Sequence, residues 1–307
     1  MKKIACAVLI MVMLTALSAC SGKKLQAITV GVLPDVDSIP LIIADNNGYF
    51  KDENLEVKIQ SFKSAMERDA ALQTGNLDGA VSDILAAAFA KEGGFDVKIT
   101  SKTDGSYKLL VGKDSGIVDM AGLKDKSVAI SKNTIIEYAT DRMLETAGMT
   151  GNDINKTAIP QIPTRLEMLQ NGKIDAATLP EPLASVAMGN GAILLNSSDN
   201  LDINPGVLLF MTKTLNAKPD EIKAFYKAYN KAVDYLKTQD QSKYIDVLIE
   251  KAGFPPEVRD TIKLPAYSKA ELPTEKDFNS VIDWLTKNNL IKGQYSFNDL
   301  VDPDFAR

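Results

Sequence analysis

The sequence predicts an α/β fold built as two similar lobes that are joined by two chain crossings. The first observation is a strand at Ile28–Val32 that is followed by a short turn and an apolar helix. The second is a match between Leu72–Ala80 and Leu169–Ala177 at a constant spacing of 97 residues. The third is a pair of apolar segments, Tyr107–Val111 and Val207–Met211, which have the character of strands at the crossings between lobes.

The loop after the first strand is the first candidate for a functional role. In parallel α/β sheets, ligands bind beyond the carboxyl ends of the strands, where helix N-termini also point. This loop contains Asp35 and Asp37, and one of the two is expected to serve only as a turn former. Ser38 is the expected N-cap of the next helix, which has Pro40 in its first turn.

The two matching segments read LQTGNLDGA and LQNGKIDAA, so Leu, Gln, Gly, Asp and Ala recur in the same order. A carboxylate follows each of the two strands, Asp83 in the first segment and Glu181 in the second. The first strand and its loop have a counterpart in Ser127–Ile130 and Ser131–Thr134. Because α/β proteins reuse the same helix stops, part of this match can arise without a repeat, but the ordered series favours two similar lobes.

Helix N-caps are expected at corresponding places of the two halves. The capping-box pattern pairs Ser64 with Glu67 and Thr164 with Glu167, and Thr134 begins a further capped helix. The predicted first lobe comprises residues 27–110 and 206–307, including amphipathic helices at 218–237 and 274–287, and the second comprises residues 111–205. Two crossings between lobes indicate a hinge and a ligand cleft.

The N-terminus has the pattern of a bacterial lipoprotein signal. Two lysines precede the apolar run Ile4–Leu17, and Leu17-Ser18-Ala19-Cys20 resembles the lipobox. Residues 1–19 are then the signal peptide, Cys20 carries palmitate or a similar acyl chain, and 20–26 form a linker. The alternative is an ordinary cleaved signal with a chance cysteine. The lipobox implies an extracytoplasmic protein that is tethered to a bacterial membrane by lipid.

The composition argues against several function classes. The chain has no histidine and only two cysteines, Cys6 in the signal and Cys20, so the mature chain has no disulfide and no thiol free of lipid. Acid–base and nucleophilic catalysis most often use these residues, which favours a binding protein over an enzyme. No P-loop motif is present. Without Lys2 and Lys3, 33 basic residues stand against 40 acidic ones, and this excess disfavours nucleic acid as a partner. We expect a monomer without cofactor or metal.

Several segments resemble extracytoplasmic solute-binding proteins of ABC transporters, in the branch for nitrate, sulfonates, taurine and thiamine-pyrimidine precursors. DNNGYFK at 45–51 and NLEV at 54–57 are similar to the family signature GYF…GLEV. LKDKSVAI at 123–130 is similar to the family strand LKGKKVAI, with Asp125 where glycine is usual. GKIDAA at 172–177 and Glu181-Pro182 resemble the family segment GKIDAA…EP. Asn54 replaces a glycine, and Asn tolerates the left-handed conformation.

This resemblance implies a two-lobed periplasmic-binding-protein fold, type II-like, with two inter-lobe crossings. It also implies an ABC importer whose permease and ATPase subunits are separate chains. A lipoprotein that senses its ligand without transport would have the same fold. The fold family includes yeast-type pyrimidine synthases, but these resemble enzymes that need a histidine and a Cys-rich segment, which this chain lacks.

Eight residues at strand ends and helix starts are the candidate ligand contacts: Asp35, Asp37, Ser38, Ser64, Asp83, Ser131, Thr134 and Glu181. For each of them a turn or capping role is the alternative. We predict that Asp83 and Glu181 approach one ligand from opposite sides when the lobes close.

The expected charge around the cleft is acidic. Carboxylates accept hydrogen bonds from donor-rich or cationic ligands, so the sequence favours a nitrogen-rich solute, such as a thiamine-pyrimidine precursor, over an alkanesulfonate or other oxyanion. Arg165 is the best candidate for an anion contact, although a solvated position is preferred for it. Tyr107, Tyr138 and Phe210 are candidates for a stacking face, with core packing as the alternative.

Overall fold

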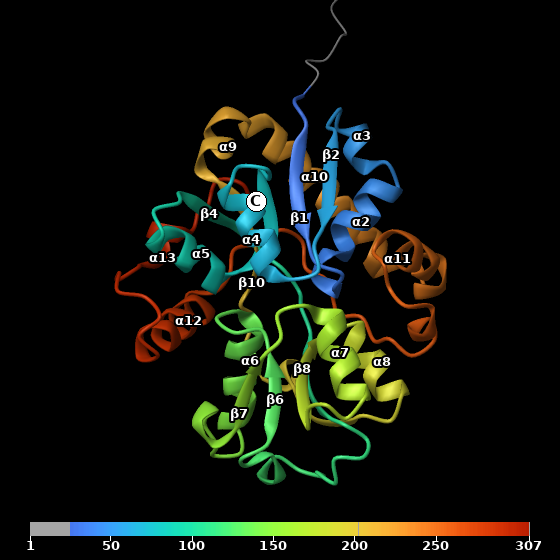
Figure 1. The fold of residues 1–307 in the computed structure, drawn as a ribbon. Helices are drawn as coiled ribbons and strands as arrows, with labels where there is room; N and C mark the ends of the chain where they lie inside the picture. The colour runs from blue at the N-terminus through green and yellow to red at the C-terminus, as the bar shows by residue number, and fades with distance from the viewer. Residues whose placement is uncertain (1–24, 202, 307) are drawn as a thin grey trace, which may run out of the picture.

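The computed structural model describes residues 25–201 and 203–306, which form two α/β lobes that lie one above the other in Figure 1. The predicted signal peptide 1–19, the lipidation site Cys20 and most of the linker lie outside the described residues. Within the described ranges, no helix has the length and apolar character needed to cross a membrane.

The first lobe contains a five-stranded sheet in the order β2-β1-β3-β10-β4. β1 pairs in parallel with β2 and β3, whereas β10 runs antiparallel to both β3 and β4. The strands are β1 (Ile28–Val32), β2 (Val57–Ser61), β3 (Gly79–Asp83), β4 (Val97–Lys102) and β10 (Gly206–Met211). The helices are α2 (Ile39–Asn46), α3 (Tyr49–Asp52), α4 (Ala65–Gln73), α5 (Ile84–Glu92), α9 (Thr212–Ala217), α10 (Pro219–Thr238), α11 (Ile245–Lys251), α12 (Glu275–Lys287) and α13 (Phe297–Leu300).

The second lobe repeats this arrangement with the strand order β7-β6-β8-β5-β9. β6 pairs in parallel with β7 and β8, and β5 runs antiparallel to β8 and β9. The strands are β5 (Tyr107–Val111), β6 (Ser127–Ile130), β7 (Asn155–Ala158), β8 (Ala176–Pro180) and β9 (Ile193–Ser197). The helices are α6 (Ile135–Glu145), α7 (Ile162–Gln170) and α8 (Leu183–Gly189).

The matched aspartates of the sequence repeat have the same structural role in both lobes. Asp78 Oδ2 accepts a hydrogen bond from the backbone N–H of Thr29 at 2.9 Å, and Asp175 Oδ2 accepts one from Ser127 N–H at 2.8 Å. Each carboxylate therefore fixes the start of the first parallel strand of its sheet. Together with the shared strand order, this confirms the prediction of two similar lobes.

The crossings lie slightly earlier than expected. β5 is a strand of the second sheet, so the predicted boundary between residues 110 and 111 is wrong: the first crossing lies between Lys102 and Tyr107. β5 is apolar because both of its faces are buried within that sheet, and not because it bridges the lobes. The second crossing runs between Ser197 and Gly206, where β10 enters the first sheet.

Both faces of the first sheet are covered by helices, as the alternation along β10 shows. Leu208 and Phe210 belong to the apolar cluster formed with α2, α3, α10 and α11. Val207 and Leu209 belong to the opposite cluster, formed with α5, α12 and α13. Since successive strand residues point to opposite faces, a continuous apolar run is expected for a strand buried on both sides. The C-terminal helices thus complete the first lobe, as predicted.

Two local predictions differ from the structure. Thr164 does not cap a helix, because α7 begins earlier, at Ile162 with Gln161 as N-cap and Pro163 in its first turn. Ser38 is the N-cap residue of α2, as predicted, but its hydroxyl donates to the carbonyl of Leu33 at 2.9 Å and makes no capping hydrogen bond to the helix. By contrast, Ser64 caps α4 as predicted.

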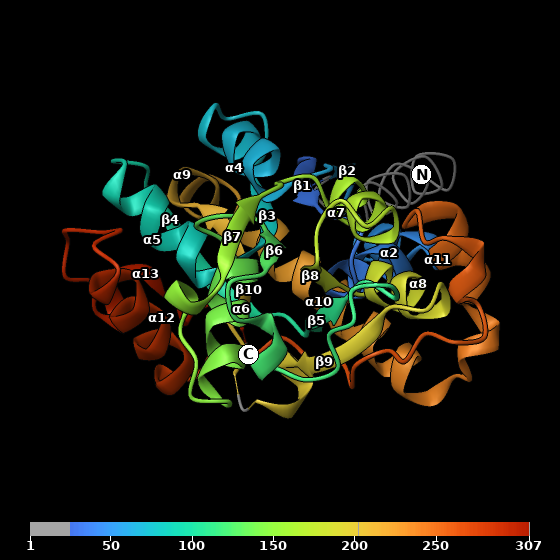
Figure 2. The same cartoon turned by 60° about the horizontal axis from the view of Figure 1, so that its bottom comes forward.

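The lobes contact each other on both sides of their junction (Figure 1 and Figure 2). On one side, Trp284 of α12 donates from Nε1 to Asp141 Oδ2 of α6 at 3.1 Å, and Tyr138 OH lies 2.8 Å from Ser280 Oγ. On the other side, Val36 N–H donates to the carbonyl of Glu181 at 3.2 Å. The described conformation is therefore one in which the lobes are closed against each other.

Trp284 is the only tryptophan of the chain, so its fluorescence reports on this junction. We expect Asp141→Ala to shift Trp284 emission to longer wavelength and to cost about 1–3 kcal/mol of unfolding free energy, because the buried indole N–H loses its acceptor. Glu145→Ala, at an exposed position one turn further along α6, is the control: it removes an ion pair with Arg142 and should change stability by less than about 0.5 kcal/mol. Unchanged emission and stability in Asp141→Ala would contradict this assignment.

Candidate functional site

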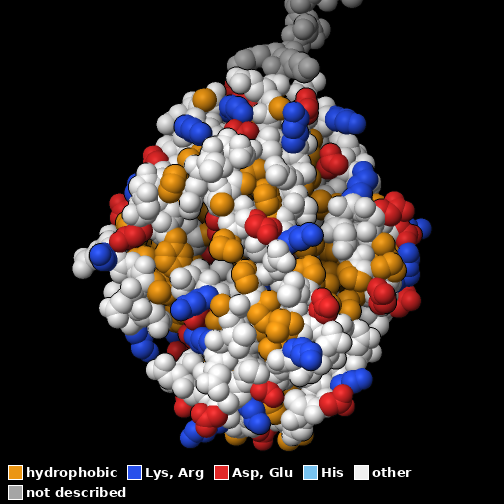
Figure 3. All heavy atoms as spheres, in the orientation of Figure 1, with side chains coloured by type: hydrophobic (Ala, Val, Ile, Leu, Met, Phe, Trp, Pro, Cys, Tyr) orange, Lys and Arg blue, Asp and Glu red, His pale blue; other side chains and the backbone are white. Residues whose placement is uncertain are grey.

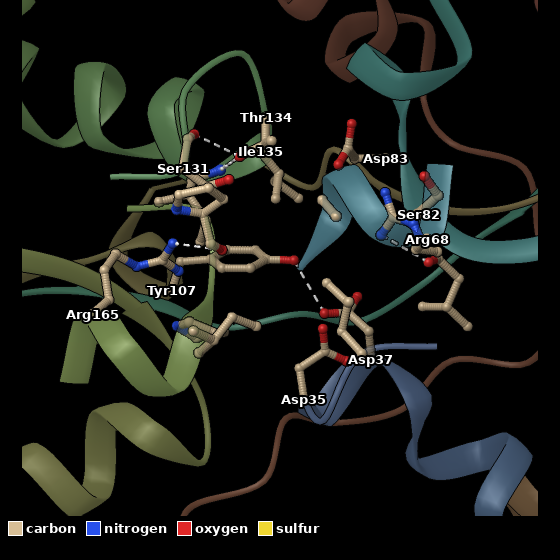
Figure 4. A pocket seen from close by; sticks show the side chains of 17 residues that line it. Asp35, Asp37, Arg68, Ser82, Asp83, Tyr107, Ser131, Thr134, Ile135 and Arg165 are labelled. Atoms are coloured by element: carbon tan, nitrogen blue, oxygen red, sulfur yellow. Dashed lines mark hydrogen bonds between the residues drawn. The ribbon is translucent and has the colours of Figure 1, made fainter. Parts of the chain in front are cut away.

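A cavity lies between the lobes, at the carboxyl ends of β1, β3, β6 and β8 (Figure 4). Its volume is about 30 Å³, which is room for one or two water molecules. A wider groove of about 510 Å³ shares Ser131, Thr134 and Pro160 with it and reaches the exposed side chain of Met66. On the face drawn in Figure 3, hydrophobic side chains gather in a band across the junction of the lobes. A solute of several heavy atoms thus needs the lobes to move apart before it can enter.

The first lobe contributes a wall of three buried aspartates, Asp35, Asp37 and Asp83. Asp37 accepts hydrogen bonds from Thr103 Oγ1 at 2.6 Å and from Tyr107 OH, on the other lobe, at 3.0 Å. Asp35 accepts from Ser38 Oγ at 3.1 Å. Asp83 caps α5 by accepting from Ala86 N–H at 2.8 Å.

Burial makes these aspartates weaker acids than usual. It raises the pKa of Asp83 to about 6, against the lowering effect of the positive charge of Arg68. Burial likewise raises the pKa of Asp37 to about 6, although the hydrogen bonds from Thr103 and Tyr107 oppose it. The pKa of Asp35 is raised well above its ordinary value by burial and by the charge of Asp37. Near pH 7, Asp37 and Asp83 are therefore mainly ionised, and Asp35 holds its proton most firmly.

Arg68 lies in the same wall, but its charge is already paired. Nη1 donates to the carbonyl of Val81 at 3.0 Å, and Nε donates to Asp69 Oδ1 at 2.8 Å. Nη2 lies 2.8 Å from that same oxygen as an ion-pair contact, without the geometry of a hydrogen bond. Asp69 thus forms an ion pair with Arg68, whose charge also acts on Asp83 and Asp35, so this side of the cavity contains three aspartates and one arginine.

The second lobe presents a buried arginine that no carboxylate neutralises. Arg165 is 0% exposed and lines the cavity. Nη1 donates to the carbonyls of Ile159 at 2.9 Å and Pro160 at 3.4 Å. Within the described residues, Nε and Nη2 have no hydrogen-bond partner. Burial alone lowers the pKa of Arg165 to about 9, with no acidic neighbour opposing it.

The preferred sequence interpretation, a solvated Arg165, is wrong. Because α7 starts at Ile162, the side chains of Ile162, Arg165 and Leu169 follow each other at helical spacing and all point into the protein. A helix that is expected to start at Thr164 leaves Ile162 out of this pattern. The observed start at Ile162 would have indicated that Arg165 is buried.

The start of α6 supplies further polar groups to the cavity. Thr134 caps this helix by accepting from Ile136 N–H at 3.2 Å, and its hydroxyl donates to the carbonyl of Ser131 at 2.8 Å. A hydrogen bond from the backbone N–H of Ile135 contributes to lowering the pKa of Asp83. The N-terminus of α6 thus faces a carboxylate of the opposite lobe, as expected for the positive end of a helix dipole.

Glu181 does not line the cavity, so the prediction that Asp83 and Glu181 face one ligand from opposite sides is wrong. The residue at the repeat spacing from Asp83 is Pro180, which lines the cavity. Glu181 follows one position later and is fully buried. It pairs with Lys108 and accepts from Ser185 N–H at 3.0 Å and Ser185 Oγ at 2.9 Å.

The remaining predicted residues divide between cavity and framework. Asp35, Asp37, Asp83, Ser131 and Thr134 line the cavity, whereas Ser38 and Ser64 do not. Of the aromatic candidates, Tyr107 lines the cavity, Tyr138 contacts Trp284 edge-on with ring centres 5.8 Å apart, and Phe210 packs on Phe225 in the core. Ser82 was not predicted: its buried Oγ lines the cavity and has no hydrogen-bond partner in the described chain.

The described residues contain no group of three or more His, Cys, Asp or Glu side chains that is arranged to hold a metal ion.

The raised pKa of Asp83 predicts a measurable pH dependence of stability. The folded protein binds this proton more tightly than the unfolded chain, where the pKa is near 3.8, so the contribution of Asp83 to the unfolding free energy falls as pH rises from about 4 to about 6. Asp83→Asn keeps the helix cap and removes the charge. We therefore expect the stability of the variant relative to the parent to rise by on the order of 2 kcal/mol between pH 4 and pH 7.

Chemical denaturation at several pH values provides the measurement. Asp246→Asn is the control, because Asp246 is exposed and its pKa is lowered by the hydrogen bond from Arg259. A stability difference between Asp83→Asn and the parent that does not vary with pH would contradict the assigned burial of the charge.

Sequence comparison finds relatives among solute-binding proteins. The chain is 29% identical over 224 residues to the "Putative aliphatic sulfonates-binding protein" of Bacillus subtilis (strain 168), covering 70% of this chain and 67% of that protein. It is 24% identical over 272 residues to the 4-amino-5-hydroxymethyl-2-methylpyrimidine phosphate synthase of Candida albicans (strain WO-1), covering 82% of this chain and 78% of that one.

Structural comparison and a family model agree with the sequence-based resemblance. The alkanesulfonate-binding protein SsuA from Xanthomonas axonopodis pv. citri bound to MOPS superimposes with a TM-score of 0.79 at 18% identity, covering 92% of this chain and all of that one. This likeness confirms the predicted two-lobed periplasmic-binding-protein fold. The model of the NMT1-like family matches residues 21–249, which is more than half of the sequence. The chain therefore belongs to the NMT1-like family.

Proposed function

We propose that this protein is the solute-binding component of an ABC importer and that its solute carries an anionic group held by Arg165. The support for the first part is the family, the fold and the relatives named as sulfonate-binding proteins. The support for the second part is one observation: Arg165 is fully buried at the cavity without a counter-charge.

The free edge of Arg165 has the geometry that recognises an oxyanion. Nε and Nη2 lie on the same side of a guanidinium group and form its side-on pair of donors. Both are without partners, while Nη1, on the other side, is occupied by the carbonyls of Ile159 and Pro160. A carboxylate or a sulfonate accepts two parallel hydrogen bonds from such a pair. The buried arginine is thereby oriented for a bidentate ligand that the protein itself does not provide.

The energetics support a ligand role over a structural one. An unpaired buried charge destabilises a folded protein by several kcal/mol, so it is retained where function requires it. The other arginines whose side chains are described are paired with carboxylates, as Arg68 is with Asp69 and Arg142 with Glu145. Arg165 differs from both, because only backbone carbonyls contact it.

We infer a binding protein and not an enzyme, although one relative is named as a synthase. The chain has no histidine, and its polar cavity residues are held by caps and hydrogen bonds at strand ends. The predicted lipid anchor at Cys20 would keep the protein at the outer side of the membrane, next to the permease subunits of the importer. The proposal includes an extracytoplasmic location and capture of the solute by hinge closure between the lobes.

Substitution of Arg165 tests the anion site. We expect Arg165→Met to weaken binding of a small sulfonate or carboxylate at least thirtyfold, or about 2 kcal/mol, since two charge-assisted hydrogen bonds are lost. The measurement is calorimetric titration with ethanesulfonate, acetate and their longer homologues, after the parent protein has identified those that bind. Arg259→Met is the matched control, because Arg259 is half exposed and pairs with Asp246.

Affinities of Arg165→Met within threefold of the parent would contradict the proposal. Loss of binding in the control as well would point to a general effect of removing a positive charge and would equally count against a specific site. Cooperative thermal unfolding of both variants verifies that they are folded.

A further inference from the structure

We infer that Asp37 is a positioning residue: its carboxylate holds the lobes in the closed arrangement through Tyr107 and the two chain crossings, and the solute is contacted by other groups. This inference rests on the proposed capture of a solute by lobe closure and adds the residues that set the closed geometry. In Figure 4, the ring of Tyr107 extends from the second lobe, and its hydroxyl points at Asp37 of the first lobe.

Both carboxylate oxygens of Asp37 are used by the region where the chain crosses between the lobes. Oδ1 accepts from Thr103 Oγ1 of the first crossing at 2.6 Å, and Oδ2 accepts from the hydroxyl of Tyr107, the first residue of β5, at 3.0 Å. Asp37 is 3% exposed. Since each oxygen has a donor from the protein, Asp37 needs no donor from a solute to be satisfied in the closed arrangement.

Two glycines, one from each crossing, pack directly against this carboxylate. A Cβ atom at Gly105 would lie 2.5 Å from Asp37 Oδ2 and 2.5 Å from Tyr107 OH. A Cβ atom at Gly206 would lie 2.9 Å from Asp37 Oδ1 and 2.6 Å from Thr103 Oγ1. Glycine at both places therefore lets the crossings approach Asp37 this closely. The N–H of Thr103 also donates to the carbonyl of Gly206 at 2.9 Å, which joins the two crossings beside Asp37.

The groups at the two ends of the Asp37–Tyr107 contact are each fixed to their own lobe. In the first lobe, Tyr267 OH donates to the carbonyl of Val36 at 3.0 Å and holds the loop that carries Asp37. In the second lobe, Tyr107 pairs with β8, and its N–H donates to Ser198 Oγ at 2.9 Å. A rotation of the lobes about the crossings would therefore separate Tyr107 from Asp37 and would not carry both along.

Charge makes the hydrogen bond between Tyr107 and Asp37 stronger than one between neutral groups. The pKa of Tyr107 is raised well above its ordinary value by burial and by the charge of Asp37, so the hydroxyl keeps its proton and is the donor. Because Asp37 is mainly ionised near pH 7, the bond is charge-assisted. Opening of the lobes breaks this bond, which therefore favours the closed arrangement.

Small-angle scattering of the ligand-free protein tests this role without any solute. We expect Tyr107→Phe, which removes only the hydroxyl, and Asp37→Asn, which removes the charge, to increase the radius of gyration, because the closed arrangement loses support. Tyr226→Phe is the matched control: Tyr226 is also buried, and its hydroxyl bonds to Thr100 within the first lobe. This control should lower stability and leave the radius of gyration unchanged.

A double-mutant cycle on solute affinity separates positioning from direct contact. The probes are ethanesulfonate, acetate and their longer homologues. Each single variant, Asp37→Asn or Tyr107→Phe, should weaken binding roughly tenfold, mainly through faster dissociation. The double variant should bind within threefold of the weaker single variant, because both changes remove the same hydrogen bond. Tyr226→Phe should bind the probes like the parent.

The outcomes separate this inference from the proposed function. A radius of gyration that is unchanged in Tyr107→Phe would overturn the inference, whatever the effect of Arg165→Met. Affinity losses that multiply to roughly a hundredfold in the double variant would also overturn it, because Asp37 and Tyr107 would then contact the solute independently. If no probe binds the parent, or if Arg165→Met binds the probes equally well, the anion site fails, while a larger radius in Tyr107→Phe still supports the role of Asp37. Cooperative thermal unfolding verifies that each variant is folded, and Tyr107→Phe alone decides the scattering test if Asp37→Asn is not.

Discussion

The buried guanidinium of Arg165 is the interaction on which this account of the binding site depends. Its position follows from α7, which begins at Ile162 and turns the arginine inward between two apolar residues. Backbone carbonyls hold one side of the group, and the side-on pair of donors has no hydrogen-bond partner among the described residues. In the closed conformation this charge is buried and has no carboxylate partner. The stability of the closed protein therefore depends on what enters the cleft.

The two-lobe architecture explains why the aspartates of the first lobe lie across the cleft from Arg165. Both sheets place the carboxyl ends of their parallel strands at the junction, and each strand end is followed by a loop or a helix start. The first lobe places aspartates there, at Asp35 and Asp37 after β1 and at Asp83 after β3. The second lobe has Ser131, Thr134 and Pro180 at the corresponding places. The repeat therefore fixes where side chains meet, while the residues at each place determine the charge. The contacts of Trp284 and Tyr138 across the junction accompany the approach of the two walls in the described conformation.

Much of the fold could be predicted from the sequence, because its signals are local or repeated. Strand β1, the cap at Ser64 and the Asp78/Asp175 match all depend on short segments. The errors arose where a shift of one or two residues changes the direction of a side chain. Glu181 lies one position beyond the equivalent of Asp83 and therefore pairs with Lys108 away from the cavity. A helix start placed at Thr164 concealed the buried position of Arg165. The membership of β5 in the second sheet depends on pairing with β8 and β9, which the sequence of β5 alone does not specify.

The central claim is that Arg165 is retained for its ligand at a cost to the stability of the empty protein. Chemical unfolding of the parent and of Arg165→Met, each with and without a saturating small sulfonate or carboxylate that binds the parent, tests it most directly. Without ligand, the account predicts that the variant is the more stable protein, by on the order of 1–4 kcal/mol, because an unpaired buried charge is removed. With ligand at about 100 times its dissociation constant, the parent alone should gain about 2.7 kcal/mol. A variant that is less stable without ligand, or that gains as much as the parent with ligand, would contradict the account.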